Sequence, residues 1–209
     1  MFLRGLALNN DRAWFQEHKT EYAGALAGFE EFLAALAFDL SAFNPALINY
    51  NAKNSVYRIY RDLRFSRDKT PYNPSLRGRV AEGGKKMIPL GIYVQLKPGD
   101  TLIGCGVWDE TPAVTRRVRD AIAARDQEFY DIVTAPGFDF TLEGDKLKNV
   151  PKEYDAAALC AEYLKHKSWL VYRGFSDDAL NGYDVLRAAA VDFYLRTRPF
   201  ADFMNAALC

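Results

Sequence analysis

Apolar residues recur at helical spacing near both ends of the chain and at every second position in the middle. Between residues 21 and 43 the intervals are three or four, which places the apolar side chains on one face of a helix. These side chains are Leu26, Phe29, Leu33, Leu36, Leu40 and Phe43. Asn44–Pro45 ends this helix, because the residue before proline avoids the helical region. A shorter helix is predicted before it, since Asn9, Asn10 and Asp11 are good N-cap residues.

The middle of the chain has the two-residue period of β-strands. Apolar residues alternate with polar or small ones over 90–97 and again over 101–107, and the intervening Lys97-Pro98-Gly99-Asp100 is typical of a tight turn. This pattern predicts a β-hairpin. Gly104 and Gly106 share one face of its second strand, where they either allow a close backbone approach or mark a bulge. Shorter alternating runs predict further strands over residues 76–80, 138–142 and 168–175.

Helices are predicted again in the second half of the chain. Thr111–Pro112 combines an N-cap residue with proline at the first helical position, which is a strong helix start. A short helix follows around residues 129–133 and ends before Pro136-Gly137. Residues 183–209 form a helical tail that Pro199 is expected to kink or to divide into two helices.

These elements indicate the α+β class, with a mostly antiparallel sheet that has a central hairpin and is packed by N-terminal and C-terminal helices. The chain has 209 residues and no repeat or linker-like stretch, so we expect a single domain over residues 1–209. Hydrophobic residues make up 49% and charged residues 26%. This balance is typical of globular proteins and excludes an intrinsically disordered chain.

Location is predicted from apolar runs and cysteines. No apolar stretch approaches the roughly 18–20 residues that a membrane span requires, so we expect no membrane partner. Arg4 interrupts the short apolar run at the start, and no basic leader precedes it, which argues against a secretory signal. Cys105, Cys160 and Cys209 are widely spaced and form no disulfide framework, which favours a cytoplasmic location. Cys105 lies in a strand pattern and is expected to be buried.

The net charge of zero, from 27 basic and 27 acidic residues, conceals a strong local asymmetry. Residues 53–86 contain ten basic and three acidic side chains and carry plus seven, so the rest of the chain carries minus seven. Arginine dominates this basic block, and its planar guanidinium suits bidentate contacts to phosphate or carboxylate groups. The balanced total argues against a broad nucleic-acid coat, and the segregation points to one concentrated cationic site or one internal salt-bridge network.

The centre of the basic block is the segment 57–72, which reads Tyr-Arg-Ile-Tyr-Arg-Asp-Leu-Arg-Phe-Ser-Arg-Asp-Lys-Thr-Pro-Tyr. Its apolar spacing fits a helix and its β-branched and aromatic content fits a strand, so its secondary structure stays open. The interleaved rings argue against a purely solvated run of charges. The arginines either form an anion-binding pocket or pair with acids in a structural network.

Other chemistry is poorly represented in the sequence. The glycines and lysines of residues 78–86 have the wrong spacing for a phosphate-binding Walker loop, and no Ser or Thr follows the lysines. His18 and His166 are the only histidines, which excludes a multi-histidine metal site. Both are flanked by charged residues and are expected at the surface. The sequence therefore indicates no metal site and leaves any cofactor unknown.

Four segments resemble the motifs of the domain-of-unknown-function 2461 family. They are Asn9–Phe15 with Lys19, Arg58–Tyr72, Gly144–Asp155 and Leu164–Ser168. The resemblance covers nearly the whole chain and implies no established activity, cofactor or partner. It marks a set of mostly cationic polar residues from separate segments: Asn10, Arg12, Trp14, Arg58, Arg61, Asp62, Arg64, Ser66, Asp68, Lys69, Tyr72, Lys146, Lys148 and Lys167.

Three functions are open at this point. In the first, all of these residues except the two aspartates bind an anionic, phosphate-bearing small molecule, and Asp62 or Asp68 is the general acid or base if a reaction follows. In the second, the chain binds nucleic acid, with Arg and Lys on phosphates and with base stacking by Tyr57, Tyr60, Tyr72 and Tyr93. In the third, the chain is a structural or partner-binding module whose arginines form internal salt bridges. Whether it is an enzyme, and its oligomeric state, stay open.

Overall fold

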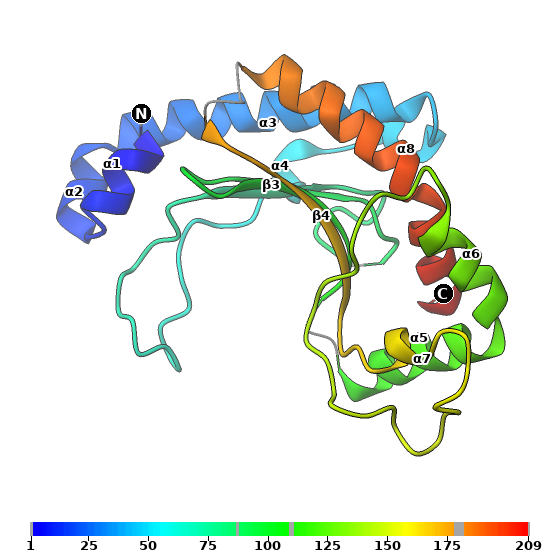
Figure 1. The fold of residues 1–209 in the computed structure, drawn as a ribbon. Coiled ribbons are helices and arrows are strands. Elements are labelled where there is room, and N and C mark those ends of the chain that lie inside the picture. The colour runs from blue at the N-terminus through cyan, green and yellow to red at the C-terminus, as the bar shows by residue number, and fades with distance from the viewer. Residues whose placement is uncertain (1, 87, 109–110, 178–181, 209) are drawn as a thin grey trace. The chain divides into compact units, whose positions relative to one another are not determined.

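The computed structural model describes residues 2–86, 88–108, 111–177 and 182–208 (Figure 1). Its elements in chain order are α1 (Phe2–Leu8), α2 (Arg12–Glu17), α3 (Lys19–Ser41), η1 (Pro45–Asn49), α4 (Ala52–Ser55), β1 (Leu76–Val80), β2 (Ile92–Leu96), β3 (Thr101–Val107), α5 (Pro112–Ala124), α6 (Asp126–Thr134), α7 (Ala161–Leu164), β4 (Trp169–Phe175) and α8 (Tyr183–Leu208). The strands form one antiparallel sheet in the order β1-β2-β3-β4, with helices toward both ends of the chain. The predicted α+β class is therefore confirmed.

The chain divides into two compact units, each assembled from several stretches of sequence. Unit 1 comprises Met1–Lys85, Tyr93–Ile103 and Gly174–Val191, and unit 2 comprises Lys86–Ile92, Gly104–Arg173 and Asp192–Cys209. The basic block of the sequence lies in unit 1, apart from its last lysine. The single domain expected over residues 1–209 stays a prediction.

Helix α3 packs against strand β1 in the core of unit 1. Phe29, Leu33, Leu36 and Leu40, which belong to the apolar stripe predicted for this helix, are fully buried. A Cβ atom at Gly78 of β1 would lie 2.5 Å from the side chain of Leu33. The close approach of helix and strand therefore depends on glycine at this position.

Two short helices precede α3 in unit 1. The second, α2, begins where the sequence predicts, and the Asp11 side chain accepts a hydrogen bond from the Trp14 backbone N–H at 2.9 Å. The first, α1, was not predicted, because seven residues are too few to display a helical period. It places Phe2 and Leu6 in a buried cluster with Phe15, and this contact holds α1 in position.

The predicted hairpin is confirmed as strands β2 and β3. Its turn has Gly99 at φ +74°, a left-handed conformation that favours glycine. Cys105 of β3 is 5% exposed, as expected. Gly106 has φ +143°, and a Cβ atom there would overlap the backbone carbonyl of Trp169 in β4. Of the two alternatives for this glycine pair, close backbone approach is the one found at Gly106.

In unit 2 the helices α5 and α6 lie where the sequence predicts, but the strand predicted over residues 138–142 is wrong. None of these described residues has strand structure. The rings of Phe138 and Phe140 instead pack on Phe200 and Phe193 of α8, with centroid distances of 5.9 and 4.9 Å. Their alternation therefore reflects packing on a helix and not pairing in a sheet.

The C-terminal tail forms one helix, α8, with Pro199 inside it, so the division into two helices is wrong. Proline removes only one backbone donor from the helix interior. Its neighbours Phe200, Phe203 and Met204 are buried, and their packing stabilises the helix across this position. Among the described ranges no helix, α8 included, is long and apolar enough to cross a bilayer.

Candidate functional site

The basic segment 57–72, all of which the structure describes, is neither a helix nor a regular strand. Two isolated antiparallel bridges hold its ends, one between Val56 and Gly78 and one between Tyr60 and Tyr72. The chain between the second pair forms a projecting loop, whose residues 61–70 we call the arginine loop. The segment is thus extended at its ends and irregular in between.

Arg61 holds the arginine loop together from inside. Its guanidinium donates to the Asp68 carboxylate, to the Thr70 hydroxyl, to the Thr70 carbonyl at 3.3 Å and to the Ser66 hydroxyl at 3.3 Å. The Thr70 backbone N–H also donates to Asp68, at 2.9 Å. The Arg61 side chain is 23% exposed. These bonds fix its planar group in one orientation.

The other cations in and next to the loop, Arg64, Lys69 and Arg58, form no hydrogen bond with Arg61 in this fully described segment. Arg64 donates to the Asp62 carboxylate through Nη2 at 2.6 Å and Nε at 3.0 Å, and both side chains are largely exposed. Lys69 donates to the Leu63 carbonyl at 3.0 Å. Arg58 is exposed. Screening by water and salt makes such surface contacts weak, so these cations add more to the local potential than to stability.

The two aspartates proposed as acid or base are both held as carboxylates. The Arg64 side chain lowers the pKa of Asp62 by hydrogen bonding. The Thr70 backbone N–H and the Arg61 guanidinium lower the pKa of Asp68 to about 2. Both groups are therefore ionised at neutral pH and are weak bases. Their assignment as general acid or base stays a prediction.

The N-terminal helices connect to the arginine loop through Asn10 and Tyr72. The Asn10 side-chain amide donates to the Tyr72 carbonyl at 2.9 Å and accepts from the Tyr72 N–H at 3.0 Å. The Tyr72 ring is 2% exposed and stacks on Phe15 at 4.2 Å. The Asn10 side chain thus gives the Tyr72 backbone the two hydrogen bonds that a neighbouring strand would otherwise provide. Because the Tyr72 ring is buried, it is not available to stack on a nucleic-acid base.

Trp14 is part of the same packing. Its ring lies against Gly5, where a Cβ atom would come within 2.7 Å of it, and it stacks on His18 with centroids 3.9 Å apart. These contacts give Trp14 a structural role in the cluster. Its contact with a ligand stays a prediction.

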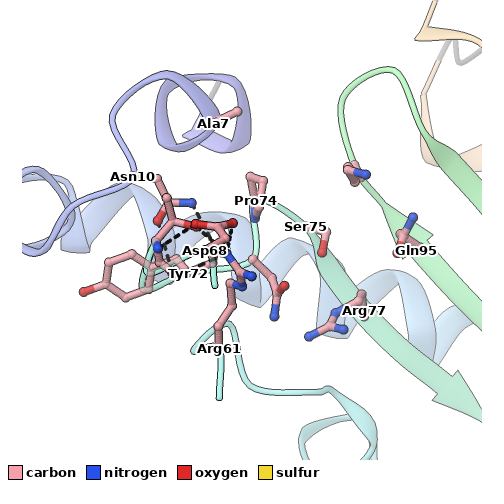
Figure 2. A pocket seen from close by; sticks show the side chains of 12 residues that line it. Ala7, Asn10, Arg61, Asp68, Tyr72, Pro74, Ser75, Arg77 and Gln95 are labelled. Atoms are coloured by element: carbon pink, nitrogen blue, oxygen red, sulfur yellow. Dashed lines mark hydrogen bonds and ion pairs between the residues drawn. The ribbon is translucent and has the colours of Figure 1, made fainter. Parts of the chain in front are cut away.

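An open pocket of about 420 Å³ lies beside the arginine loop, and we call it the Arg61 pocket (Figure 2). Its lining residues are Ala7, Asn10, Arg61, Asp68, Thr70, Tyr72, Asn73, Pro74, Ser75, Arg77, Gln95 and Lys97, all in unit 1. Figure 2 shows two groups of side chains around it, with Asn10, Arg61, Asp68 and Tyr72 on one side and Ser75, Arg77 and Gln95 on the other. The pocket therefore joins the family motif to strands β1 and β2.

The lining of the Arg61 pocket carries three cations and one carboxylate. Asp68 is bound by Arg61, and Lys97 is paired at 2.7 Å with Asp100, which does not line the pocket. Arg77 contacts the Tyr57 ring at 6.0 Å and the Arg58 carbonyl at 3.5 Å, and no carboxylate among the described residues pairs with it. The pocket thus has a surplus of positive charge, centred on Arg77.

A second open hollow of about 630 Å³ borders the arginine loop, and it is lined by Asn10, Asp11, Arg12, Leu63, Asp68, Lys69, Thr70 and Pro71. Two predicted cations, Arg12 and Lys69, belong to this hollow and not to the Arg61 pocket. Asn10, Asp68 and Thr70 line both. Six of the sequence-predicted residues of unit 1 thus line one or both of two neighbouring depressions. The other five line neither, and they are Trp14, Arg58, Asp62, Arg64 and Ser66.

The three predicted lysines of the second half belong to unit 2. Lys146 and Lys148 are exposed, and Lys167 lines a pocket within that unit. The structure therefore does not assemble them with Arg61 within one unit. Their role in binding the same ligand stays a prediction.

His166 corrects another expectation. It is 1% exposed and not at the surface, its Nδ1 lies 3.0 Å from the Ser168 carbonyl oxygen, and burial lowers its pKa. The flanking lysines were misleading, because a residue in an antiparallel bridge alternates in direction with its neighbours. His166 bridges Lys146 and is buried between the partly buried Lys165 and the exposed Lys167.

Sequence reasoning missed several residues of the Arg61 pocket, above all Arg77, Ser75, Gln95 and Lys97. The signal that could have found them is the strand period. Ser75 and Arg77 are two positions apart at the start of β1, and Gln95 and Lys97 are two positions apart at the end of β2, so the strand period places the members of each pair on the same side of the chain. What the sequence does not encode locally is that the arginine loop lies against these two strands.

Comparison of the sequence with known protein families gives a match. The model of a family described as a conserved hypothetical protein, DUF2461, matches residues 1–203. The curated proteins and the solved structures give no match.

Proposed function

The chain belongs to the DUF2461 family of conserved hypothetical proteins, and we propose that it binds an anionic, phosphate-bearing small molecule in the Arg61 pocket. The observation that carries the proposal is the convergence of Arg61, Arg77 and Lys97 on one pocket that has Asp68 as its single carboxylate. A pocket of about 420 Å³ is in the size range of small-molecule sites.

The two arginines have different parts in this proposal. Arg61 is fixed by its bonds to Asp68, Thr70 and Ser66, so it presents a pre-organised guanidinium at little entropic cost. Arg77 has no carboxylate partner among the described residues, so an incoming phosphate does not have to displace one. A phosphate between them accepts charge-assisted hydrogen bonds, which are roughly twice as strong as neutral ones.

Neutral polar groups complete the lining of the pocket. Asn73, Ser75 and Gln95 offer donors and acceptors that carry no charge. They are suited to the uncharged part of a ligand, such as hydroxyl or amide groups next to the phosphate. The proposed ligand is therefore a small organic phosphate.

The salt-bridge alternative accounts for only part of the basic block. Arg61 pairs with Asp68 and Arg64 with Asp62, as that alternative requires. Arg77 pairs with no described carboxylate, although it lies beside the same loop. We therefore assign the Arg64–Asp62 pair to structure, the Arg61–Asp68 pair to orienting Arg61 in the pocket, and Arg77, which has no described carboxylate partner, to binding.

Nucleic-acid binding is retained as the second candidate because of the tip of the arginine loop. The Phe65 side chain is 95% exposed, and the Arg64 guanidinium lies 5.9 Å from its ring. Tyr60 is also exposed, at 52%. Exposed rings beside arginines suit base stacking with phosphate contacts, but the buried ring of Tyr72 removes one of the four predicted stacking residues.

A cytoplasmic location is kept as part of the proposal, since the three cysteines give no disulfide framework. Of the two aspartates considered as acid or base, only Asp68 lines the Arg61 pocket, and its lowered pKa favours electrostatic positioning over proton transfer.

The test is a calorimetric titration of the full chain with inorganic phosphate, pyrophosphate and, as a carboxylate anion, citrate. We expect pyrophosphate to bind more tightly than citrate, because its tetrahedral oxygens engage two guanidinium groups. Arg77→Gln should weaken pyrophosphate binding about tenfold or more. Arg64→Gln is the matched control, because it removes the same charge from an exposed position that does not line the pocket.

Two results would contradict the proposal. One is the absence of phosphate and pyrophosphate binding at low salt, and the other is an equal loss of affinity in Arg77→Gln and Arg64→Gln. Tight binding of single-stranded DNA or RNA that is lost in Phe65→Ala, with no pyrophosphate binding, would favour the second candidate.

A further inference from the structure

Unit 2 has a pocket that the proposed function does not use. It has a volume of about 850 Å³, and we call it the Trp108 pocket. Its lining residues are Trp108, Pro112, Thr115, Arg119, Glu143, Gly144, Asp145, Leu147, Lys167, Ser168, Leu170 and Tyr172, all within unit 2. The later motifs noted in the sequence, around Gly144 and Lys167, meet here.

The frame of the Trp108 pocket is built from two paired segments. The N–H of Glu143 donates to the Leu170 carbonyl at 2.7 Å, and the N–H of Lys167 donates to the Asp145 carbonyl at 2.7 Å. Gly144 between them has φ +127°, and a Cβ atom there would overlap Ser168. The backbone that carries Glu143, Asp145 and Lys167 is therefore hydrogen-bonded to a neighbouring segment and is not a free loop.

Two aromatic side chains in this lining are unusually exposed. Trp108, directly after β3, is 67% exposed, and Tyr172 of β4 is 49% exposed. By contrast, Trp169 on the same strand as Tyr172 is fully buried. Exposed large rings around a pocket indicate a surface kept for a ligand, because burial of such rings is normally favourable.

Arg119 contributes a fixed cation. Its Nη2 donates to the His166 carbonyl at 2.7 Å, while its Nε is buried and has no hydrogen-bond partner among the described residues. Burial lowers the pKa of this guanidinium. An arginine this poorly satisfied is stabilised when a ligand brings acceptor atoms to the pocket.

The charges of the lining cancel, and this narrows the chemical class of the ligand. Arg119 and Lys167 are balanced by Glu143 and Asp145. The carboxylates disfavour a phosphate-bearing ligand, the cations disfavour an ammonium ligand, and a purely apolar ligand would desolvate all four charges. A neutral molecule with apolar faces and many hydroxyl groups satisfies both the rings and the charged donors and acceptors.

We propose that the Trp108 pocket binds a neutral carbohydrate, with a sugar ring on the exposed faces of Trp108 or Tyr172 and its hydroxyl groups on Glu143, Asp145 and Arg119. None of its lining residues belongs to the Arg61 pocket, and all of them lie in unit 2. Each hydroxyl both donates and accepts, so one ring uses the carboxylates and the guanidinium together.

The test titrates the full chain with cellobiose, maltose and chitobiose, followed by tryptophan fluorescence and calorimetry. Adenosine and glucose 6-phosphate are the comparison ligands. We expect at least one disaccharide to bind and to change the emission of Trp108. Trp108→Ala should weaken its binding about tenfold or more, whereas Trp108→Phe, which keeps an aromatic face, should restore most of the affinity.

Glu143→Gln should also weaken binding, because it removes the charge that strengthens hydroxyl hydrogen bonds. Phe65→Ala in unit 1 is the control, since it removes an even more exposed ring that does not line the Trp108 pocket and should leave sugar binding unchanged. The proposal is overturned if none of the three disaccharides shows binding at a sugar concentration of 50 mM, since a dissociation constant of this size corresponds to a binding free energy of only roughly 2 kcal/mol. It is also overturned if adenosine or glucose 6-phosphate binds in their place, or if Trp108→Ala binds the sugar as the wild type does.

Discussion

Replacement of Asn10 by alanine tests how the N-terminal helices hold the arginine loop. Asn10 gives the backbone of Tyr72 one donor and one acceptor, at 2.9 and 3.0 Å. Alanine leaves both backbone groups of a residue that is 2% exposed without this partner. With about 1 kcal/mol for each group, because the contact is only partly buried, Asn10→Ala should lower the free energy of unfolding by about 2 kcal/mol.

The assay is urea unfolding followed by the fluorescence of Trp14, which belongs to the same cluster. Asn9→Ala is the matched control, because its amide makes one exposed hydrogen bond to the Gly5 carbonyl at 3.1 Å. That variant should change the free energy by less than about 0.5 kcal/mol. Equal effects of the two substitutions would refute the reasoning, since they would show that the Tyr72 backbone gains nothing from Asn10.

Two further predictions concern unit 2 and the pH response of the loop. Gly106→Ala should destabilise unit 2 strongly in thermal unfolding, because its φ is +143° and the new Cβ meets the Trp169 carbonyl. Gly137→Ala should not destabilise the protein, because a Cβ atom there would meet open space. Similar melting curves for the Gly106→Ala and Gly137→Ala variants would contradict this prediction. The pKa of Asp68 lies below its usual value, so its contribution is present at neutral pH and is lost as pH falls from about 3.8 to about 2. The protection of the Thr70 amide from hydrogen exchange, relative to the intrinsic exchange rate at each pH, should fall only in that range, and a fall already near pH 6 would contradict it.

The fold was predictable where one face of an element is buried. The stripe of α3 and the alternation of β2 and β3 each recur over enough residues to separate helix from strand. The alternating run over residues 138–142 was misread as a strand, because an alternation of only three apolar residues also fits side chains that pack on a helix. Pro199 shows a second limit, since the buried residues that follow it outweigh the lost hydrogen bond.

The candidate site was predictable in its charges but not in its assembly. Counting by segment located Arg61 and the loop around it, because segregated charge is a property of the sequence itself. Arg77 carries the same charge, but its importance depends on which arginines have carboxylate partners, and only the folded chain shows this. His166 was misplaced for the same reason, because its burial is a property of the folded chain that its charged neighbours do not reveal.

Phosphate binding in the Arg61 pocket can be tested by a crystal structure of the protein grown with pyrophosphate. We expect pyrophosphate in this pocket, with its oxygens within hydrogen-bond distance of the guanidinium groups of Arg61 and Arg77. An empty pocket at a pyrophosphate concentration that saturates the protein in solution, or pyrophosphate bound only elsewhere on the chain, would contradict the claim.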